Sequence, residues 1–336
     1  MSAGSVKAAV VGVGYLGTFH AEKLARLPEA ELVAVVDSDP VRAEKLARSL
    51  GCRGLSDHRE LLGQVQAVSV VTPTVSHFAV ARDFLAAGAD VLCEKPMTTT
   101  LEEADQLIAL AADQGRILQV GHLERFNPAV EGMFARAGKP LFIECNRIAP
   151  FKARATDVDV VLDLMIHDLD IILSLVNEEP SEIRAKGVPV LGPHADLVNA
   201  RLEFPGGCVA NITASRLALK DERKMRLFQP DAYLSLDFKK RKLLVVNGVE
   251  YRPGGVPKVS AERPRFGKSD PLERELKSFL ECVQTRKPPR VDGGAGRRAL
   301  ACALAVRTCV QQGLCQYQEL LDKSPRWVAA RPPEEA

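Results

Sequence analysis

Three features that would point to a particular class of protein are missing from this chain of 336 residues. No apolar run approaches the roughly 20 residues that a membrane-spanning helix needs. The net charge is only +2, so no strong attraction to nucleic acid or to a membrane surface is expected. The eight cysteines include no CxxC pair, and they are interpreted as small buried side chains in a reducing cytosol. These absences predict a cytoplasmic protein with no nucleic-acid partner, no membrane partner and no required metal.

The length and the composition indicate a globular protein of two domains. Hydrophobic residues make up 46% of the chain and charged residues 26%, which is ordinary for such a protein. A chain of this length is too long for one ordinary core. We expect a dinucleotide-binding domain over 1–122 and a substrate-binding and oligomerisation domain over 123–336.

Short apolar runs alternate with amphipathic stretches in the first third of the chain. The runs are rich in Val and Ile and do not alternate strictly, which suits strands buried on both faces of a parallel sheet. Strand–helix alternation of this kind predicts a doubly wound α/β domain. The expected strands are 7–12, 31–37, 67–72, 90–94 and 117–121.

A glycine motif follows the first of these runs. Gly12, Gly14 and Gly17 have GxGxxG spacing, with Tyr15 and Leu16 between the last two. The spacing alone is a weak signal, but here it directly follows an expected strand and opens an expected helix. The motif therefore predicts a dinucleotide site, in which the helix N-terminus faces the pyrophosphate.

Asp37 ends the second run, about 20 residues past the glycines, where a carboxylate accepts hydrogen bonds from the adenosine ribose. Its other possible role is to cap the following helix, but Ser38 or Asp39 can do that. A 2′-phosphate would be repelled by Asp37, and no arginine follows at once. NAD is therefore favoured over NADP as the cofactor.

Polar residues at the ends of the later runs are expected to border one crevice, because ligands bind outside the carboxyl ends of parallel strands. Lys95 matters most among them. It could form an ion pair with Glu94, but a lysine at the end of a central strand is better placed for function. The candidates to contact the cofactor here are Thr72, Pro73, His77, Glu94, Lys95 and His122.

The segment 157–176 combines a buried pattern with five aspartates and a histidine. If it is a helix, Asp163 and His167 lie at i and i+4 on one face, and Asp159 and Asp170 lie near the same ridge. One interpretation is a hydrogen-bonded pair in the core. The other is a catalytic pair that faces the nicotinamide, and the segment by itself does not choose between them.

These residues together resemble the Gfo/Idh/MocA family of sugar oxidoreductases. The EKP motif followed by an Asp-x-x-x-His helix is far more specific than the glycine motif, which every Rossmann protein shares. The similarity extends over nearly the whole chain. The matching segments are GVGYLG at 12–17, Asp37, TPTVSHFAVA at 72–81, EKP at 94–96, GHLERFNPAV at 121–130 and DLMIH at 163–167.

The resemblance implies a second α+β domain with a large, open, mostly antiparallel sheet. Alternating segments at 199–216 and 232–247 are compatible with it, with turns expected at 205–207 and at Asn247-Gly248. The exposed face of such a sheet implies a homo-oligomer, a dimer or tetramer. The stretch 251–270 is rich in Pro, Gly and charge and predicts a long loop.

The resemblance also implies NAD-dependent oxidation of a sugar hydroxyl. His167 or Lys95 would take the hydroxyl proton, and the sequence leaves that choice open. Lys95 can also donate a hydrogen bond to the substrate oxygen, and Asp163 can orient His167 or bind a neighbouring hydroxyl.

The sequence segments 121–130 and 154–170 are most similar to the branch of the family that acts on UDP-N-acetylhexosamines. This implies oxidation of the 3-hydroxyl, with UDP-N-acetylglucosamine favoured, ahead of 2,3-diamino sugar synthesis for lipid A or surface polysaccharide. Two alternatives stay open: an NAD-dependent dehydrogenase of a free polyol or aldose, and a dinucleotide-sensing regulator. The candidate ligands for the UDP-sugar are Arg125, Asn127, Arg147, Lys152 and Arg154, with Lys95, Asp163 and His167.

Overall fold

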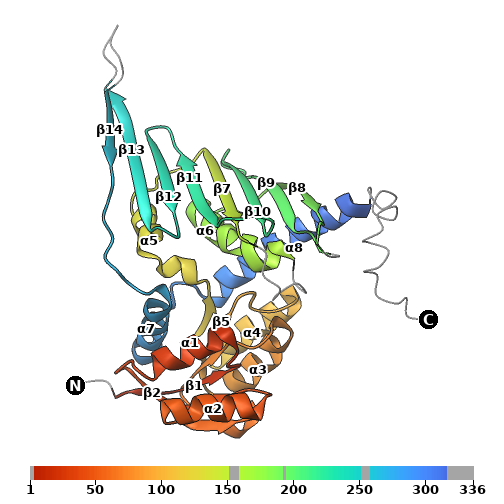
Figure 1. The fold of residues 1–336 in the computed structure, drawn as a ribbon, viewed down its shortest axis with the longest axis vertical. Helices are drawn as coiled ribbons and strands as arrows, with labels where there is room; N and C mark the ends of the chain where they lie inside the picture. The colour runs from red at the N-terminus through yellow and green to blue at the C-terminus, as the bar shows by residue number, and fades with distance from the viewer. Residues whose placement is uncertain (1–3, 151–158, 192–193, 251–257, 316–336) are drawn as a thin grey trace. The chain divides into compact units, whose positions relative to one another are not determined.

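The computed structural model describes residues 4–150, 159–191, 194–250 and 258–315. The chain divides into two compact units. The first comprises Met1–Phe126 and Ser269–Leu300, and the second comprises Asn127–Lys268 and Ala301–Ala336. Figure 1 shows the first unit in red to orange with the blue helix α7 (Pro271–Thr285) against it.

The first unit contains a six-stranded sheet in the order β3-β2-β1-β4-β5-β6, and every strand pair is parallel. This is the strand order of a dinucleotide-binding doubly wound fold, so the predicted fold class is confirmed. The three-residue strand β3 was not predicted, because Arg-Gly-Leu carries almost no apolar signal. The strands are β1 (Val6–Val11), β2 (Ala30–Val36), β3 (Arg53–Leu55), β4 (Ala67–Val70), β5 (Asp90–Glu94) and β6 (Leu118–Gly121).

Three helices share one hydrophobic cluster with this sheet: α1 (Tyr15–Leu24), α2 (Pro40–Leu50) and α7. Leu276 and Leu280 of α7 are fully buried in that cluster beside Val10 of β1. The units thus divide the chain differently from the expected boundary at residue 122, because the apolar face of α7 packs on the first sheet. The remaining helical segments of the first unit are η1 (His58–Leu61), α3 (Thr74–Ala86), α4 (Leu101–Asp113) and η2 (Leu123–Phe126).

Helix α2 has clear local start and stop signals. The Asp39 carboxylate accepts from the backbone amides of Val41 and Arg42, and Pro40 occupies the first helical position. Gly51 ends the helix at φ +71°, in the left-handed region that favours glycine. The cap at Asp39 leaves the neighbouring Asp37 available for another role, as the sequence suggested.

The second unit contains an eight-stranded sheet in the order β14-β13-β12-β11-β7-β10-β9-β8. Its strand pairs are antiparallel except for β7 with β10, so the predicted large, mostly antiparallel sheet is confirmed. The strands are β7 (Phe142–Ile148), β8 (Glu182–Val188), β9 (Leu197–Glu203), β10 (Val209–Ser215), β11 (Glu222–Phe228), β12 (Ala232–Asp237), β13 (Lys242–Glu250) and β14 (Lys258–Glu262).

Two local predictions in this sheet were wrong. Asn247-Gly248 lies inside β13 rather than in a turn, at a point where the register with β14 shifts. The expected loop 251–270 is interrupted by β14, which pairs with β13, whereas 263–270 has no regular structure and 251–257 lies outside the described residues. In both cases strand pairing overrides a local preference for turns, which is the usual outcome where propensity is weak.

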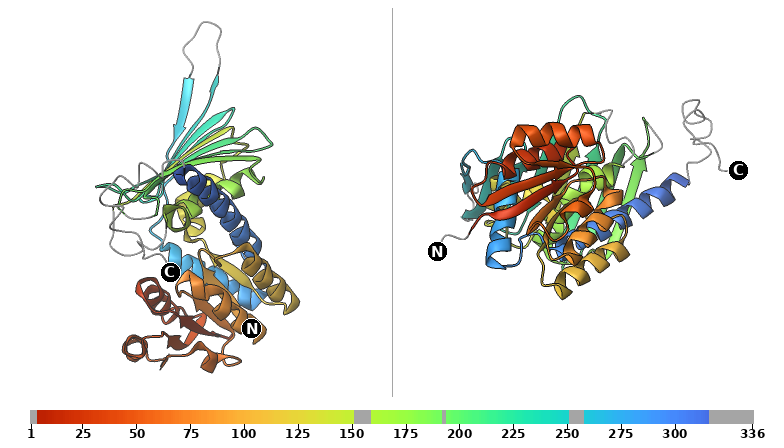
Figure 2. Two further views of the ribbon diagram at one scale, coloured as in Figure 1. Left: turned by 90° about the vertical axis from the view of Figure 1, so that its right-hand side faces the viewer. Right: turned by 90° about the horizontal axis from the view of Figure 1, so that it is seen from below.

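Four helical segments belong wholly or partly to the second unit. They are α5 (Pro128–Phe134), the π-helical turn η3 (Val161–Met165), α6 (Ile166–Val176) and the C-terminal part of α8 (Gly293–Cys315). Figure 2 shows α6 and that part of α8 on one face of the large sheet. Buried and partly exposed residues alternate along β7, as expected for a sheet covered on one face. Within the described ranges, no helix is long and apolar enough to cross a membrane.

Candidate active site

A hollow of about 700 Å³ lies at the glycine loop of the first unit. It is lined by the ends of β1, β2 and β4 and by the segments that follow them, which is where ligands bind in open parallel sheets. Of the predicted cofactor residues, it brings together Gly12, Gly14, Asp37, Thr72 and Pro73. The remaining lining residues include Val11, Val36, Ser38, Arg42, Ser56, Asp57, His58, Val71 and Ser76.

The three glycines of the loop have different steric surroundings. A Cβ on Gly12, whose φ is +87°, would lie 2.7 Å from the backbone nitrogen of Thr72. A Cβ on Gly17 would lie 1.8 Å from the Gly12 carbonyl oxygen, so α1 can approach β1 only without a side chain there. Gly14 has nothing within 4 Å of its Cβ position. Such a surface suits the approach of a pyrophosphate to the helix N-terminus, so the loop fits a dinucleotide.

Asp37 is buried at the edge of this hollow, with 7% of its side chain exposed. The backbone amide of Val13 donates to its Oδ2 at 2.9 Å, and the amide of Asp39 donates to its Oδ1 at 3.0 Å. These two amides fix the carboxylate where an adenosine ribose would meet it. The structure therefore fits the ribose-binding role that the sequence predicts.

Arg42 also lines the hollow, and the sequence prediction missed it. Its Nη1 lies 3.2 Å from Asp37 Oδ1 and 3.4 Å from Asp37 Oδ2. The signal that could have found it is its position in the first turn of α2, only five residues after Asp37. The prediction considered only an arginine directly after the aspartate.

His77 joins the loops that follow β4 and β5. Its Nδ1 lies 2.8 Å from the carbonyl oxygen of Pro96, and its Nε2 lies 2.8 Å from that of Thr72. Burial lowers the pKa of His77, although the two carbonyls act in the opposite direction. Only a protonated ring could donate to both carbonyls, and burial opposes that protonation. A neutral ring donates to one of the two carbonyls, and it lies between Thr72 and Pro96, the last residue of the EKP motif.

Glu94 lies buried directly before Lys95. Its Oε1 is 3.3 Å from Nε2 of the fully buried His20, whose Nδ1 is 2.8 Å from the Ser69 hydroxyl. Its Oε2 accepts from the Lys95 backbone amide at 3.2 Å. Burial alone would raise the pKa of Glu94, but His20 and then Lys95 outweigh it, and the pKa is lowered. Glu94 is therefore a carboxylate at neutral pH, and it fixes the backbone on which Lys95 stands.

A second buried carboxyl group, Glu275 of α7, lies in the electrostatic range of Glu94 and was not predicted. Burial, followed by the Glu94 charge, raises the pKa of Glu275 well above its usual range. Neither of its carboxyl oxygens has a hydrogen-bond partner. Both effects favour the protonated form of Glu275, because burial and a nearby negative charge each oppose ionisation of a carboxyl group.

The other predicted residues of the first unit lie around β6. His122 directly follows this strand and is 1% exposed. Arg125 lies in the short helix η2, where its carbonyl oxygen accepts from Arg290 at 3.0 Å. Neither residue lines the hollow at the glycine loop, and the same is true of Glu94 and Lys95. Their contacts with cofactor or substrate stay predictions.

The predicted catalytic residues of the second unit lie on one helix that begins in an unusual way. Asp159 caps it through the amides of Val161 and Leu162, and Arg307 pairs with Asp159 at 2.7 Å. The first turn, 161–165, is π-helical, and the α-helix proper starts at Ile166. Asp163 lies in the π-helical turn and His167 in the first turn of α6, and both are partly exposed. Single π-helical turns are frequent at functional sites.

Arg147 of β7 is buried against α6 rather than exposed. Its Nε donates to Asp168 Oδ2 at 2.9 Å, and its Nη2 donates to Asp168 Oδ1 at 2.7 Å. Both side chains are almost fully buried, and the guanidinium also lies 5.0 Å from the ring centroid of Phe238. Arg147 was predicted to bind substrate, whereas its contacts join the helix that carries His167 to the centre of the sheet.

Asn127 also has structural contacts. Its side-chain oxygen accepts from the Ala129 amide and caps α5, and its side-chain nitrogen donates to the Phe238 carbonyl at 3.2 Å. The side chain is buried, so α5 and β12 occupy the groups that were expected to bind sugar. The predicted substrate residues Lys152 and Arg154 lie outside the described residues.

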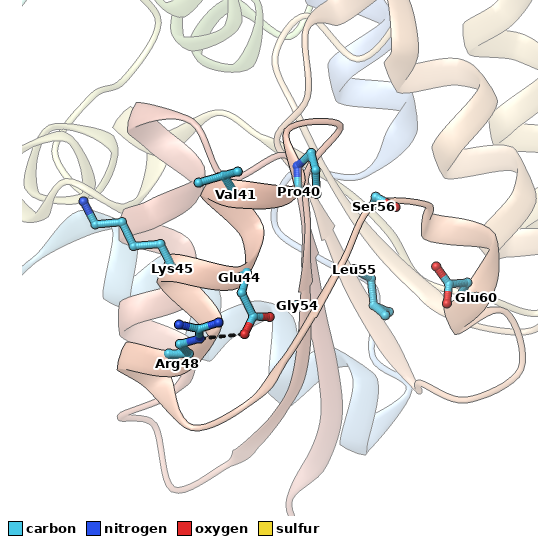
Figure 3. A pocket seen from close by; sticks show the side chains of 9 residues that line it. All are labelled: Pro40, Val41, Glu44, Lys45, Arg48, Gly54, Leu55, Ser56 and Glu60. Carbon is cyan, nitrogen blue, oxygen red and sulfur yellow. Dashed lines mark hydrogen bonds and ion pairs between the residues drawn. The ribbon is translucent and has the colours of Figure 1, made fainter.

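A second hollow, of about 780 Å³, adjoins the first at Ser56. Figure 3 shows Glu44, Lys45 and Arg48 extending from α2 and Glu60 from η1. Glu44 accepts from Arg48 at 2.7 Å. The volume of this second hollow is similar to that of the hollow at the glycine loop, but neither Asp37 nor any of the three loop glycines lines it. We therefore assign the cofactor to the hollow that contains Asp37.

Within the residues that the structure describes, no group of three or more His, Cys, Asp and Glu residues could hold a metal ion. The chemistry available from the described side chains is acid–base and electrostatic. The first unit offers a nucleotide site and Lys95, and the second offers Asp163 and His167. This set of groups suits proton transfer that accompanies hydride transfer to a dinucleotide.

Sequence models of known families match both units. Residues 6–122 match the oxidoreductase family with an NAD-binding Rossmann fold, GFO/IDH/MocA. Residues 132–232 match the GFO/IDH/MocA C-terminal domain. The first match covers the whole parallel sheet, and the second covers the strands from β7 to the start of β12.

Individual relatives extend the similarity over most of the chain. UDP-N-acetylglucosamine 3-dehydrogenase of Acidithiobacillus ferrooxidans is 42% identical over 91% of this chain and 97% of that enzyme. scyllo-Inositol 2-dehydrogenase (NAD⁺) of Bacillus subtilis is 33% identical over 63% of this chain and 67% of that enzyme.

A solved structure of the Acidithiobacillus enzyme superposes with a TM-score of 0.88 at 41% identity, covering 92% of this chain and 99% of the other. A scyllo-inositol dehydrogenase of Lactobacillus casei has the same fold, with a TM-score of 0.77 at 20% identity over 93% of this chain and 98% of that one. Both units, the glycine loop, Asp37 and the EKP motif are thus placed in one family. The chain belongs to the Gfo/Idh/MocA oxidoreductases and is an NAD-dependent enzyme of that family.

Proposed function

We propose that this enzyme oxidises the 3-hydroxyl of UDP-N-acetylglucosamine to the 3-keto sugar nucleotide, with NAD as the hydride acceptor. The observation that carries the proposal is the 42% identity with the Acidithiobacillus UDP-N-acetylglucosamine 3-dehydrogenase, over nearly the full length of both chains. The similarity in three dimensions also covers both units, with a TM-score of 0.88.

The cofactor supplies the redox chemistry when it is bound, and this chain supplies binding, orientation and proton transfer. Asp37 binds the adenosine ribose, and the glycine loop binds the pyrophosphate. His167 takes the proton of the reacting hydroxyl, because a neutral imidazole near pH 7 is suited to that role. Lys95 donates to the same oxygen and stabilises its developing negative charge, and Asp163 orients His167.

A UDP-sugar gives the enzyme a binding handle far from the reacting carbon. Binding energy from such a handle can align the reacting carbon with the nicotinamide. The cations proposed to hold the pyrophosphate are Arg125 and, outside the described residues, Lys152 and Arg154. Arg147 is left out of this set, since Asp168 occupies its guanidinium.

The test is NADH formation by the purified protein with UDP-N-acetylglucosamine, free N-acetylglucosamine and myo-inositol, each with and without UDP. The proposal expects turnover of the UDP-sugar, very poor turnover of the free sugar, and competitive inhibition by UDP. If UDP fails to compete while a free sugar or polyol reacts efficiently, the substrate assignment is wrong and the family assignment still stands.

A polyol such as inositol is the second candidate substrate. It is favoured by the 33% identity with the NAD⁺-dependent scyllo-inositol 2-dehydrogenase, although that similarity covers a smaller share of the chain. The same assay separates the two candidates, because inositol carries no diphosphate and its oxidation should be indifferent to UDP.

We further propose that the 3-keto product is consumed by an aminotransferase, which would yield a 2,3-diamino sugar for lipid A or surface polysaccharide. We also propose a homo-oligomer, a dimer or tetramer, formed through the large sheet. Light scattering on the purified protein tests the assembly, and a monomeric mass would contradict it.

A further inference from the structure

The carboxylate of Asp37 is already engaged on both of its oxygens. Oδ2 accepts from the Val13 amide, and Oδ1 accepts from the Asp39 amide. Arg42 Nη1 then lies within 3.4 Å of both oxygens. The residue that should exclude a 2′-phosphate by its charge is therefore partly neutralised by a neighbouring cation.

Local structure determines where Arg42 lies. The Asp39 cap starts α2, and the Arg42 backbone amide is one of the two groups that the cap binds. This places the side chain in the first helical turn, directly beside Asp37. The Arg42 side chain is 52% exposed and Asp37 only 7%, so the guanidinium can move whereas the carboxylate is fixed. Arg42 and Asp37 both line the hollow that we assign to the cofactor.

The two side chains act in opposite directions on a nucleotide that carries a 2′-phosphate. A carboxylate accepts from ribose hydroxyls and repels phosphate, whereas a guanidinium binds phosphate through charged hydrogen bonds. We propose that Arg42 is a specificity-determining residue: it offsets Asp37, binds the 2′-phosphate, and allows the enzyme to take NADP as a second, weaker cofactor beside NAD.

This inference deepens the cofactor part of the assignment and does not depend on the sugar. In the wild type, Arg42 divides its charge between Asp37 and an incoming phosphate, so NAD keeps the advantage. When the Asp37 charge is removed, the guanidinium keeps its 3.6 Å ion pair with Asp39 but becomes more available to the phosphate. The Asp37–Arg42 pair, rather than Asp37 alone, then determines the ratio of the affinities for NAD and NADP.

The experiment is a fluorescence titration of the purified protein with NADH and NADPH, without any sugar. Arg42→Ala should weaken NADPH binding by about tenfold or more, because the 2′-phosphate loses its charged partner and the Asp37 charge is no longer offset. NADH binding should change by less than about threefold, since the amides of Val13 and Asp39 still hold Asp37. Asp37→Asn keeps the shape of the side chain, and it should reduce the difference in affinity between NADH and NADPH. In the Asp37→Asn/Arg42→Ala double variant this difference should return to about its wild-type size.

Arg48→Ala is the matched control, because Arg48 is an exposed arginine on the same helix that is bonded to Glu44 outside the cofactor hollow. It should leave both affinities unchanged, and circular dichroism should show that all variants are folded. The proposal is overturned if Arg42→Ala binds NADPH as well as the wild type does. It is also overturned if Asp37→Asn raises the affinity for NADPH equally in the presence and in the absence of Arg42. Since no sugar is present, either result is independent of the proposed substrate.

Discussion

Two buried carboxyl groups, Asp168 of the second unit and Glu275 of the first, have opposite electrostatic surroundings. In the second unit, Asp168 meets Arg147 through two charged hydrogen bonds, and both side chains are almost fully buried. In the first unit, the charge that acts on buried Glu275 is another carboxylate, Glu94. At Asp168 the negative charge is thus compensated by a cation, whereas at Glu275 burial and a neighbouring negative charge oppose ionisation.

The difference shows what each arrangement can do. A bidentate arginine–carboxylate pair has a defined geometry, so it fixes α6 on β7 and with it the helix that carries His167. A protonated carboxyl group has no charge to pair, and its state depends on pH. The first unit thereby lets Glu94, with its contacts to His20 and to the Lys95 amide, carry the only negative charge of that pair.

The largest expected effect comes from breaking the pair in the second unit. Asp168→Asn leaves the Arg147 charge buried without a counter-charge, and we expect the free energy of unfolding to fall by about 3–5 kcal/mol. Urea unfolding followed by circular dichroism measures this change. The double variant Arg147→Met/Asp168→Leu removes both charges and should recover most of the loss. A loss below about 1 kcal/mol in the single variant would mean that the pair does not hold the helix.

The next largest effect is a loss of turnover in variants of two residues, one from each unit, that are proposed to act on the substrate. Lys95→Met and His167→Asn should each lower kcat by a factor of about 10² or more, because each is proposed to act on the reacting hydroxyl. NADH affinity, measured by titration, should stay close to that of the wild type. Asp163→Asn should lose less if it only orients His167. Near-normal turnover in the Lys95 or His167 variant would return that residue to a structural role.

A smaller effect concerns pH and the first unit. Because the folded pKa of Glu275 is raised, the unfolded chain releases this proton at a lower pH than the folded protein does. The contribution of Glu275 to the free energy of unfolding is therefore complete at acid pH. It is lost, at up to about 1.4 kcal/mol per pH unit, as the pH rises from the unfolded pKa toward the folded pKa.

Glu275→Gln should remove that slope and should be at least as stable as the wild type at neutral pH. Urea unfolding at several pH values between 5 and 8 tests this. The control is Glu281→Gln on the exposed side of the same helix, which should keep the wild-type slope. An unchanged slope in Glu275→Gln would show that Glu275 is ionised in the folded protein.

The smallest expected effect comes from a partly exposed ion pair on the same strand, β7, that carries the buried Arg147. Glu144 lies on the opposite face of β7 from Arg147 and pairs with Arg226 of β11 at 2.9 Å, with both side chains partly exposed. Glu144→Gln should reduce stability by less than about 1 kcal/mol, since solvent screens such pairs. A loss comparable with that of Asp168→Asn would contradict the view that burial, rather than pairing, makes the other pair important.

Five strands of the parallel sheet could be predicted because they carry short, nearly continuous apolar runs, several of which end in recognisable motifs. The helix that contains His167 could be predicted as well, since its end at Val176 matches the expected 176. Its π-helical turn could not be foreseen, because apolar periodicity does not separate a π-helical turn from an α-helical one over five residues.

The ionic partners were harder to predict, because they join residues far apart in the chain. Asp168 lies 21 residues from Arg147, and Glu275 lies 181 residues from Glu94. One signal was available for Arg147. It is in phase with Ile143 and Cys145 on the buried face of β7, which argues against exposure to solvent.

The π-helical turn at Val161–Met165 has a consequence for alignment with relatives. Such a turn absorbs one residue more than an α-helix of the same length, so a homologue with a regular helix would align there with a single-residue gap. Asp163 lies within the turn and His167 beyond it, whereas the Asp168 anchor follows both. A deletion of Leu164 or Met165 would therefore rotate Asp163 about the helix axis relative to His167 and leave the Asp168–Arg147 register intact. A short insertion or deletion at this point would redirect the side chain of Asp163, which is proposed to orient His167, without disturbing the fold that supports it.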